Sequence, residues 1–259
     1  MDINDFDSLI SRLDDLKRCA TRGSLGVSAF FSPRELRAAE EYLCSCGAAF
    51  LSYGGYLDAE RKKVYILPDF AENCKSADEL LEYGYSTELE AFLIRGSGFE
   101  RITHRDVLGS LLGLGVERDV LGDIIMIDDS SAVVICDSKL VSFFESGLSR
   151  IGRDTVKIKR ILLDELILPE RKTAPISDTV ASPRLDCVVA ALCSISRERA
   201  KERILASTVE LDYAIEERPD REVVAPTVLS IRGVGKFKVL SVCERTKKGR
   251  LRLLAEKYL

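Results

Sequence analysis

The sequence predicts an α+β fold in three parts, and the order of helical and strand-like segments distinguishes the parts. Residues 1–76 mix helices with short strands as an N-terminal α/β domain. Residues 77–168 follow the order strand, helix, strand, strand, helix, strand. Residues 182–242 begin with two short helices and end in strands, and residues 243–259 form a basic hairpin or tail. A chain of 259 residues is long enough to give each part its own core.

The N-terminal part is predicted from two amphipathic helices and a Gly-Gly turn. Asp7–Arg22 carries leucine and isoleucine at helical spacing, and Ser32-Pro33-Arg34-Glu35 begins a second helix that runs to about Cys46. A short apolar strand, the Gly54-Gly55 turn and a strand over 63–67 follow. Taken alone, the charge cluster that follows this turn is typical of a solvated edge.

The second part has the element order of the split βαβ plait. We expect strands over 88–95, 123–128, 132–137 and 155–161, and helices over 103–114 and 140–151. Ferredoxin-like and RNA-recognition-motif-like domains share this order, so it does not decide a function. The third strand, over 132–136, lacks the aromatic side chains on which an RNA-recognition motif stacks bases. Any RNA contact of this part is therefore expected to use other groups.

A basic helix pair follows a predicted linker over 166–182. Leu185, Val188 and Leu192 recur at helical spacing, and Ser196 is placed to cap a second helix. Arg197 and Lys201 are four residues apart and share one face of that helix. A helix pair that exposes cations is suited to bind phosphate.

This pattern resembles the S-four domain, the RNA-binding module named after the fourth small-subunit ribosomal protein. The matching residues are Arg184-Leu185-Asp186, Ser196-Arg197, Ala200 and Ile204, and Ser230–Phe237 matches the closing strand. The turns at 207–212 and 226–227 depart from the family pattern. The resemblance implies RNA contacts by Arg184, Ser196, Arg197, Lys201, Arg232 and Lys236. Further RNA contacts are expected from Arg61, Lys62, His104, Arg105, Lys247 and Lys248.

The charge distribution agrees with a basic C-terminal module. The net charge of the chain is −4, which on its own argues against nucleic-acid binding. Residues from Pro183 onward, however, hold 16 Lys and Arg against 11 Asp and Glu. Attraction to nucleic acid is thus localised in one region, and because the excess is modest, we expect binding to weaken with salt.

The sequence gives little support for catalysis or for a metal. His104 is the single histidine, and no serine or cysteine elbow accompanies it. Cys44 and Cys46 are the closest cysteine pair, and zinc needs four ligands. Gly233-Val234-Gly235-Lys236 lacks the third glycine and the helix of a nucleotide loop. We expect no enzyme activity, cofactor, metal or small-molecule substrate.

The location predicted from composition is the cytoplasm. Eight cysteines without a small-scaffold framework favour a reducing compartment. The acidic start of the chain lacks a secretory leader, and no run approaches the roughly 18 apolar residues of a membrane span.

Across nearly the whole chain, the motifs resemble the YlmH family of bacterial S-four-containing proteins. Besides the C-terminal module, the resemblance rests on Phe31-Ser32-Pro33, Gly54-Gly55-Tyr56, Ala59-Glu60-Arg61, Thr103-His104-Arg105-Asp106, Leu108-Gly109, Leu112–Gly115, Glu117-Arg118 and Leu121–Ile124. It implies binding to large-subunit ribosomal RNA and to tRNA, including peptidyl-tRNA. The implied role is ribosome quality control, in which such proteins assist C-terminal tailing of stalled nascent chains.

Two alternatives stay open at this point. S-four modules often accompany pseudouridine synthase or methyltransferase domains, so the chain could be an accessory to RNA modification. The YlmH family has also been called cell-division proteins, which leaves a scaffold for septum proteins as the second alternative.

Overall fold

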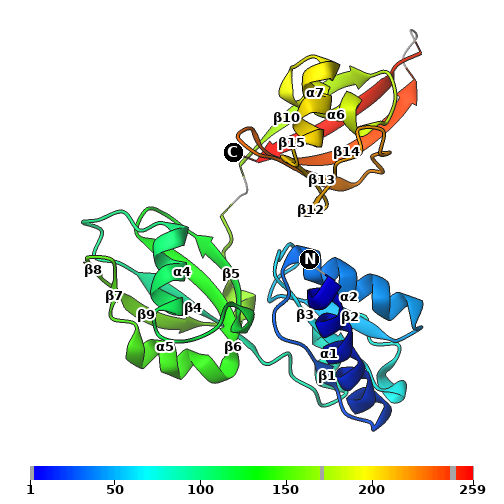
Figure 1. The fold of residues 1–259 in the computed structure, drawn as a ribbon. Helices are drawn as coiled ribbons and strands as arrows, with labels where there is room; N and C mark the ends of the chain where they lie inside the picture. The colour runs from blue at the N-terminus through cyan, green and yellow to red at the C-terminus, as the bar shows by residue number, and fades with distance from the viewer. Residues whose placement is uncertain (1–2, 170–171, 246–248, 259) are drawn as a thin grey trace. The chain divides into compact units, whose positions relative to one another are not determined.

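The computed structural model describes residues 3–169, 172–245 and 249–258, and the chain divides into two compact units. The first unit spans residues 1–169 and the second residues 170–259. Each unit has its own sheets (Figure 1). Each unit also has its own hydrophobic core. None of the helices in the described residues combines the length and the apolar character needed to span a bilayer.

The N-terminal part of the first unit, residues 3–86, packs helices α1 and α2 on a three-stranded antiparallel sheet of order β1-β3-β2. Leu9, Leu13 and Leu43 of the helices are buried with Val64 and Ile66 of β3. The elements are α1 (Ile3–Thr21), β1 (Gly26–Val27), α2 (Pro33–Ser45), β2 (Phe50–Tyr53), β3 (Lys63–Ile66), η1 (Asp69–Ala71) and α3 (Ala77–Glu82).

The helix start predicted at Ser32 is confirmed. Ser32 Oγ accepts a hydrogen bond from the Glu35 backbone N–H, and the Glu35 carboxylate accepts one from the Ser32 N–H at 2.8 Å. This capping box satisfies two of the free donors at the start of α2. Pro33 occupies the first turn, where its missing N–H has no helical partner to lose.

The central part of the first unit, residues 87–169, has the main element order expected from the sequence. The helix predicted over 140–151 is too long, because it ends at Gly147 and a short hairpin over residues 150–155 precedes the last strand. The sheet of this part is antiparallel with order β5-β6-β4-β9, and Val107, Leu111 and Phe144 of the helices pack on one face. The elements are β4 (Leu89–Arg95), α4 (His104–Leu112), η2 (Arg118–Val120), β5 (Leu121–Met126), β6 (Ser131–Asp137), η3 (Ser138–Leu140), α5 (Val141–Gly147), β7 (Arg150–Ile151), β8 (Asp154–Thr155), β9 (Lys157–Ile161) and η4 (Leu163–Glu165).

The opposite face of this sheet is covered by the N-terminal part. Val133 and Ile135 of β6 are buried with Phe30, and the partly buried rings of Tyr53 and Tyr56 pack against them. Lys63 of β3 is 3% exposed, and its Nζ lies 2.7 Å from Asp137 Oδ2 at the end of β6. Both faces of β6 are therefore buried, which removes the surface that base stacking on this strand would need.

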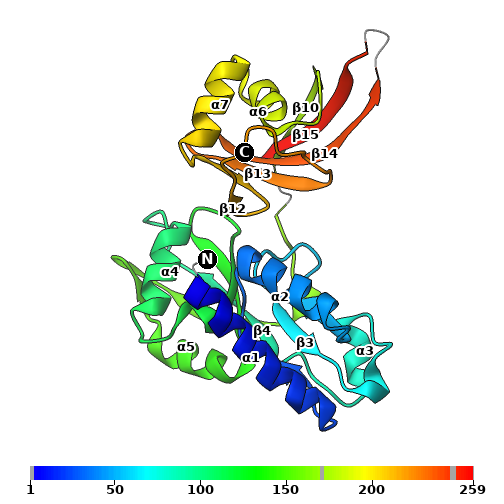
Figure 2. The ribbon, with the colours of Figure 1, turned by 45° about the vertical axis from the view of Figure 1, so that its right-hand side comes forward.

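The second unit places a pair of helices on one face of a six-stranded antiparallel sheet of order β10-β15-β14-β13-β11-β12 (Figure 2). Leu185, Val188, Leu192, Ala200 and Ile204 are buried, as their spacing predicts. The elements are β10 (Thr173–Val180), α6 (Leu185–Cys193), α7 (Arg197–Leu205), β11 (Val209–Leu211), β12 (Ala214–Ile215), β13 (Thr227–Ile231), β14 (Gly235–Arg245) and β15 (Leu251–Tyr258).

The linker predicted over residues 166–182 is wrong in its second half. Strand β10 lies there and pairs with β15 along its whole length. Pro175, Ser177 and Asp178 gave this segment the composition of a turn. Because β10 is an edge strand, Pro175 can sit in it without removing a hydrogen bond from the interior of the sheet.

The segment Ser230–Phe237, matched to a closing strand, is a hairpin. Strand β13 ends at Ile231 and β14 begins at Gly235. Gly233 has φ +78°, a left-handed conformation that glycine adopts without a steric cost. The hairpin expected near the C-terminal end is present, but its strands β14 and β15 are central strands of the same sheet.

Candidate nucleic-acid interface

The basic helix pair is organised around one buried carboxylate. Asp186, in the first turn of α6, is 0% exposed and accepts hydrogen bonds from Arg184 (Nε 3.3 Å, Nη2 3.2 Å) and from Arg197 (Nε 3.0 Å). The two arginine side chains are 39% and 46% exposed. Two cations thus share one anion, which fixes both guanidinium planes and leaves N–H donors for a phosphate. We call these three residues the arginine fork.

The arginine fork determines the pKa of Asp186. Burial alone would raise that pKa, but the hydrogen bonds from Arg184 and Arg197 outweigh burial and hold it below the ordinary value of 3.8. Because the folded pKa is lower than the unfolded one, the carboxylate stabilises the fold above the unfolded pKa. This contribution is lost as the pH falls through the lowered folded pKa. We expect the carboxyl carbon signal of Asp186 in an NMR titration to move only below pH 3.8. A midpoint above that value would contradict the assignment.

Ser196 and Lys201 complete the exposed end of α7. Ser196 Oγ accepts a hydrogen bond from the Arg199 N–H at 3.3 Å, so Ser196 caps the helix as the sequence predicts. Lys201 is partly exposed one turn after Arg197. The spacing of four places their cations on the same side of the helix.

Arg232 lies in the exposed turn between β13 and β14, near the other end of α7. Arg203 Nη1 donates to the Arg232 carbonyl oxygen at 3.3 Å. A hollow of about 640 Å³ runs between this turn and residues 207–210. Arg203 therefore lies beside Arg232, although it is not among the residues predicted to contact RNA. Its position in the last turn of a helix, where cations bond nearby carbonyl groups, is the signal that could have found it.

Lys236 faces away from the helix pair. Phe237 and Val239 of β14 are buried in the core with the helices, so the alternating Lys236 and Lys238 point to the opposite face of the sheet. Lys236 Nζ lies 4.8 Å from the centroid of the Tyr213 ring and 5.6 Å from that of Tyr258. We call Tyr213, Lys236, Lys238 and Tyr258 the tyrosine face. The six predicted RNA contacts are thus divided between two faces of the unit.

Arg61 lies at the joint between the two parts of the first unit. Its guanidinium donates to the carbonyl oxygens of Phe30, Leu121 and Arg118 at 2.9, 2.9 and 3.2 Å. Desolvation by burial lowers the pKa of Arg61. The side chain expected to reach RNA therefore points inward and holds protein backbone.

Asp123 provides the other half of this joint. Its carboxylate accepts hydrogen bonds from the Tyr56 hydroxyl at 2.7 Å and from the backbone N–H groups of Glu60 and Arg61 at 2.7 and 3.0 Å. A Cβ at Gly54 would lie 2.2 Å from the Arg61 carbonyl oxygen, so this turn can approach so closely only with glycine.

His104 lines a hollow of about 490 Å³ together with Arg61, Arg118 and Asp123, whereas Lys62 and Arg105 do not line it. Thr103 and Asp106 form a capping box that begins α4, as expected for the motif around His104. Desolvation and then the charge of Arg118 lower the pKa of His104. Lys62 is partly exposed and Arg105 exposed, whereas Lys247 and Lys248 lie outside the described residues. Within the described ranges, no group of three or more His, Cys, Asp or Glu could hold a metal ion.

Comparisons with known proteins connect these features to a family. A family model described as "Putative RNA-binding domain in YlmH" matches residues 87–165. The "Ribosome-associated protein quality control protein P2" of Bacillus subtilis (strain 168) is 30% identical over 234 residues, which cover 89% of this chain and 86% of that protein. The chain belongs to the YlmH family. The solved structure of the cell division protein ylmH from Streptococcus pneumoniae is similar in fold. Its TM-score is 0.51 at 24% identity, over 64% of this chain and 96% of that chain.

Several motifs that suggested the YlmH family meet at the Arg61–Asp123 joint. The close turn comes from Gly54-Gly55-Tyr56, and the guanidinium comes from Arg61 in Glu60-Arg61. The segment Leu121–Asp123 supplies the carboxylate of Asp123 and the carbonyl group of Leu121 that Arg61 binds. In this YlmH-family chain these residues join the N-terminal part to the central sheet. Their clustering has a structural role, because their hydrogen bonds hold the two parts together.

Proposed function

We propose that this chain is a non-catalytic RNA-binding protein of the large ribosomal subunit, with ribosomal RNA and tRNA as its ligands. Its role is the quality control of stalled nascent chains. The observation that carries the proposal is the arginine fork at the exposed end of the helix pair, which presents cations in fixed planes suited to phosphate. The printed name of the Bacillus subtilis relative supports the connection with ribosomes, and the family model supports RNA binding.

The fold assignments that belong to this proposal are an RNA-recognition-motif-like plait and an S-four-type module. The sheet order β5-β6-β4-β9 supports the first, because it is the order that a split βαβ plait produces. The buried helix pair capped by Ser196 supports the second. Both faces of β6 are covered, so RNA contacts of the plait come from the edge of its sheet. Lys157 and Lys159 of the edge strand β9 are exposed there.

The tyrosine face supplies a second mode of contact. Partly exposed aromatic rings with cations between them are suited to unpaired nucleotides, because rings stack on bases while cations meet the phosphates. The helix pair then binds the backbone of folded RNA, and the opposite face of the sheet binds an unpaired segment.

The buried state of Asp186 supports a role without catalysis. Arg184-Leu185-Asp186 superficially resembles a pseudouridine synthase motif, but its carboxylate is 0% exposed and bonded by two arginines. A group so enclosed cannot reach a nucleotide base. The arrangement therefore favours an RNA-binding protein over an accessory to RNA modification.

The experiment is binding of the full chain to purified large subunits as a function of salt. Replacing Arg197 disturbs the arginine fork, so the sharper variant is Lys201→Ala with Arg232→Ala, which leaves Asp186 and its partners intact. We expect weaker co-sedimentation and a slope of log affinity against log salt smaller by about 2. The control is Arg218→Ala with Arg221→Ala, which removes two cations that pair with Glu216. Equal binding by both double variants would contradict the proposal.

A further inference from the structure

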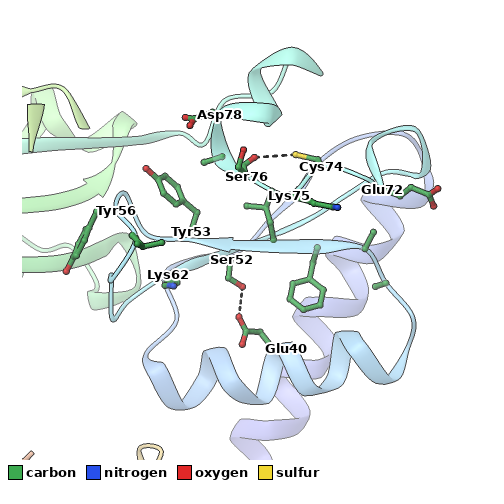
Figure 3. A pocket seen from close by; sticks show the side chains of 16 residues that line it. Glu40, Ser52, Tyr53, Tyr56, Lys62, Glu72, Cys74, Lys75, Ser76 and Asp78 are labelled. Atoms are coloured by element: carbon green, nitrogen blue, oxygen red, sulfur yellow. Dashed lines mark hydrogen bonds between the residues drawn. The ribbon is translucent and has the colours of Figure 1, made fainter. Parts of the chain in front are cut away.

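A groove of about 760 Å³ follows strand β2 in the N-terminal part of the first unit (Figure 3). One wall is the continuous segment Ala48–Tyr53, and the opposite wall comes from residues between Glu72 and Asp78. Glu40 of α2 lies at the side of the groove. Successive residues of a strand point to opposite faces of the sheet. Because consecutive residues line the groove, it must run along the edge of the strand.

The backbone of β2 presents hydrogen-bonding groups to this groove. Leu67 N–H donates to the Ala49 carbonyl oxygen at 2.9 Å, and the register then pairs Leu51 with Tyr65 and Tyr53 with Lys63. In an antiparallel ladder the intervening residues point their peptide groups the other way, so those of Phe50 and Ser52 face the groove. Strand β2 ends the sheet order β1-β3-β2, and within the described residues these groups have no hydrogen-bond partner.

The other sheet edges in the described residues are protected in recognised ways. Strands β1, β7, β8 and β12 are two residues long, β9 carries cations, β10 carries Pro175 and Asp178, and β5 has an irregular register and Asp123. Strand β2, with the sequence Phe-Leu-Ser-Tyr, has neither a charge nor a proline. An unprotected edge beside a groove is the arrangement that domains use to bind a peptide as an added strand.

We propose that this groove receives an extended peptide segment of a partner protein, which pairs antiparallel with Phe50 and Ser52 and carries a Lys or Arg between two apolar residues. The side chains of β2 define this pattern. The acids that line the groove, Glu40, Glu72 and Asp78, outnumber its cations, Lys62 and Lys75. Ser52 Oγ donates to Glu40 Oε1 at 2.7 Å, so the peptide residue opposite Ser52 points toward a carboxylate. The neighbouring peptide residues face the other side of β2, where the Tyr53 ring lies (Figure 3). The Tyr53 ring and Ala77 line the groove there beside Ser76 and Asp78, so apolar side chains can pack on the ring.

The first test uses the full chain and the synthetic peptide Val-Thr-Val-Lys-Val-Thr-Val, followed by NMR. We expect the amide signals of Phe50 and Ser52 to shift and their hydrogen exchange to slow. The same peptide with N-methyl groups on the amides that face β2 should bind about tenfold more weakly or not at all, because it loses backbone hydrogen bonds. Glu in place of the central Lys should weaken binding about fivefold.

The second test changes the protein. Ser52→Pro removes one outward N–H and leaves the β2–β3 hydrogen bonds, whereas Ser52→Ala keeps that N–H. We expect the first variant to lose peptide binding and the second to retain it within about twofold.

Three results would overturn the proposal. They are equal binding of the N-methylated peptide, no response of the Phe50 and Ser52 amides at millimolar peptide, and dimerisation of the chain that Ser52→Pro abolishes. The last would assign the edge to a second copy of this chain.

Discussion

Asp186→Asn is expected to destabilise the second unit by about 3 kcal/mol, since it removes the buried charge that two arginines share. The substitution keeps the size of the side chain but leaves Arg184 and Arg197 without their counter-ion. Hydrogen exchange of the full chain resolves the second unit from the first. Amides of the buried residues Val188 and Val189 should exchange about a hundredfold faster if they exchange through unfolding of the unit.

The matched control is Glu202→Gln, which removes an exposed acid from the neighbouring helix α7. Its effect on the same amides should stay within about 0.5 kcal/mol. If Asp186→Asn is as mild as this control, the arginine fork is not the organising feature of the helix pair, and its guanidinium groups are held by other contacts.

Gly54→Ala is expected to destabilise the first unit by about 2–3 kcal/mol through overpacking. The new Cβ would lie 2.2 Å from the Arg61 carbonyl oxygen and 2.7 Å from the Ala59 Cβ. Both belong to the segment that Asp123 holds, so relief of the clash requires movement of the joint. Urea unfolding monitored on the first unit measures the effect.

Gly109→Ala is the control for this prediction. Gly109 lies inside α4, and a Cβ there meets nothing within 4 Å. Alanine should leave stability unchanged or raise it by up to about 1 kcal/mol, because it is the better helix former. Equal stability of the two variants would show that the Gly54 turn yields easily and that the joint is not closely packed.

Most of the fold features that could be predicted from the sequence depend on motifs within a short stretch of residues. Ser32, Thr103 and Ser196 each mark a helix start through a hydrogen bond within three residues, so a short stretch of sequence contains the whole motif. The spacing of Leu185, Val188 and Leu192 likewise fixes the buried face of α6. Strand β10 could not be recognised in this way, because its pairing partner β15 lies at the other end of the unit.

The sequence predicts which types of residue belong to the candidate site, but it does not predict which way their side chains point. Arg61 and Arg197 are both cations beside turns or caps, yet one guanidinium binds backbone inside the first unit while the other is half exposed. Sequence spacing does not say which way such a side chain turns. Tyr213 and Tyr258 were missed because a turn and a distant strand bring them to one lysine, and no local pattern contains both.

The position of β15 has a consequence for the order in which the chain acquires structure during synthesis. This strand is the last of its sheet to be made, yet it lies between β10 and β14. The helix pair and the β13–β14 hairpin involve nearby residues and can form early, whereas β10 must wait for a partner that follows all of them. A chain interrupted before Leu251 would therefore hold a complete first unit and, after it, a sheet with β10 and one edge of β14 unpaired.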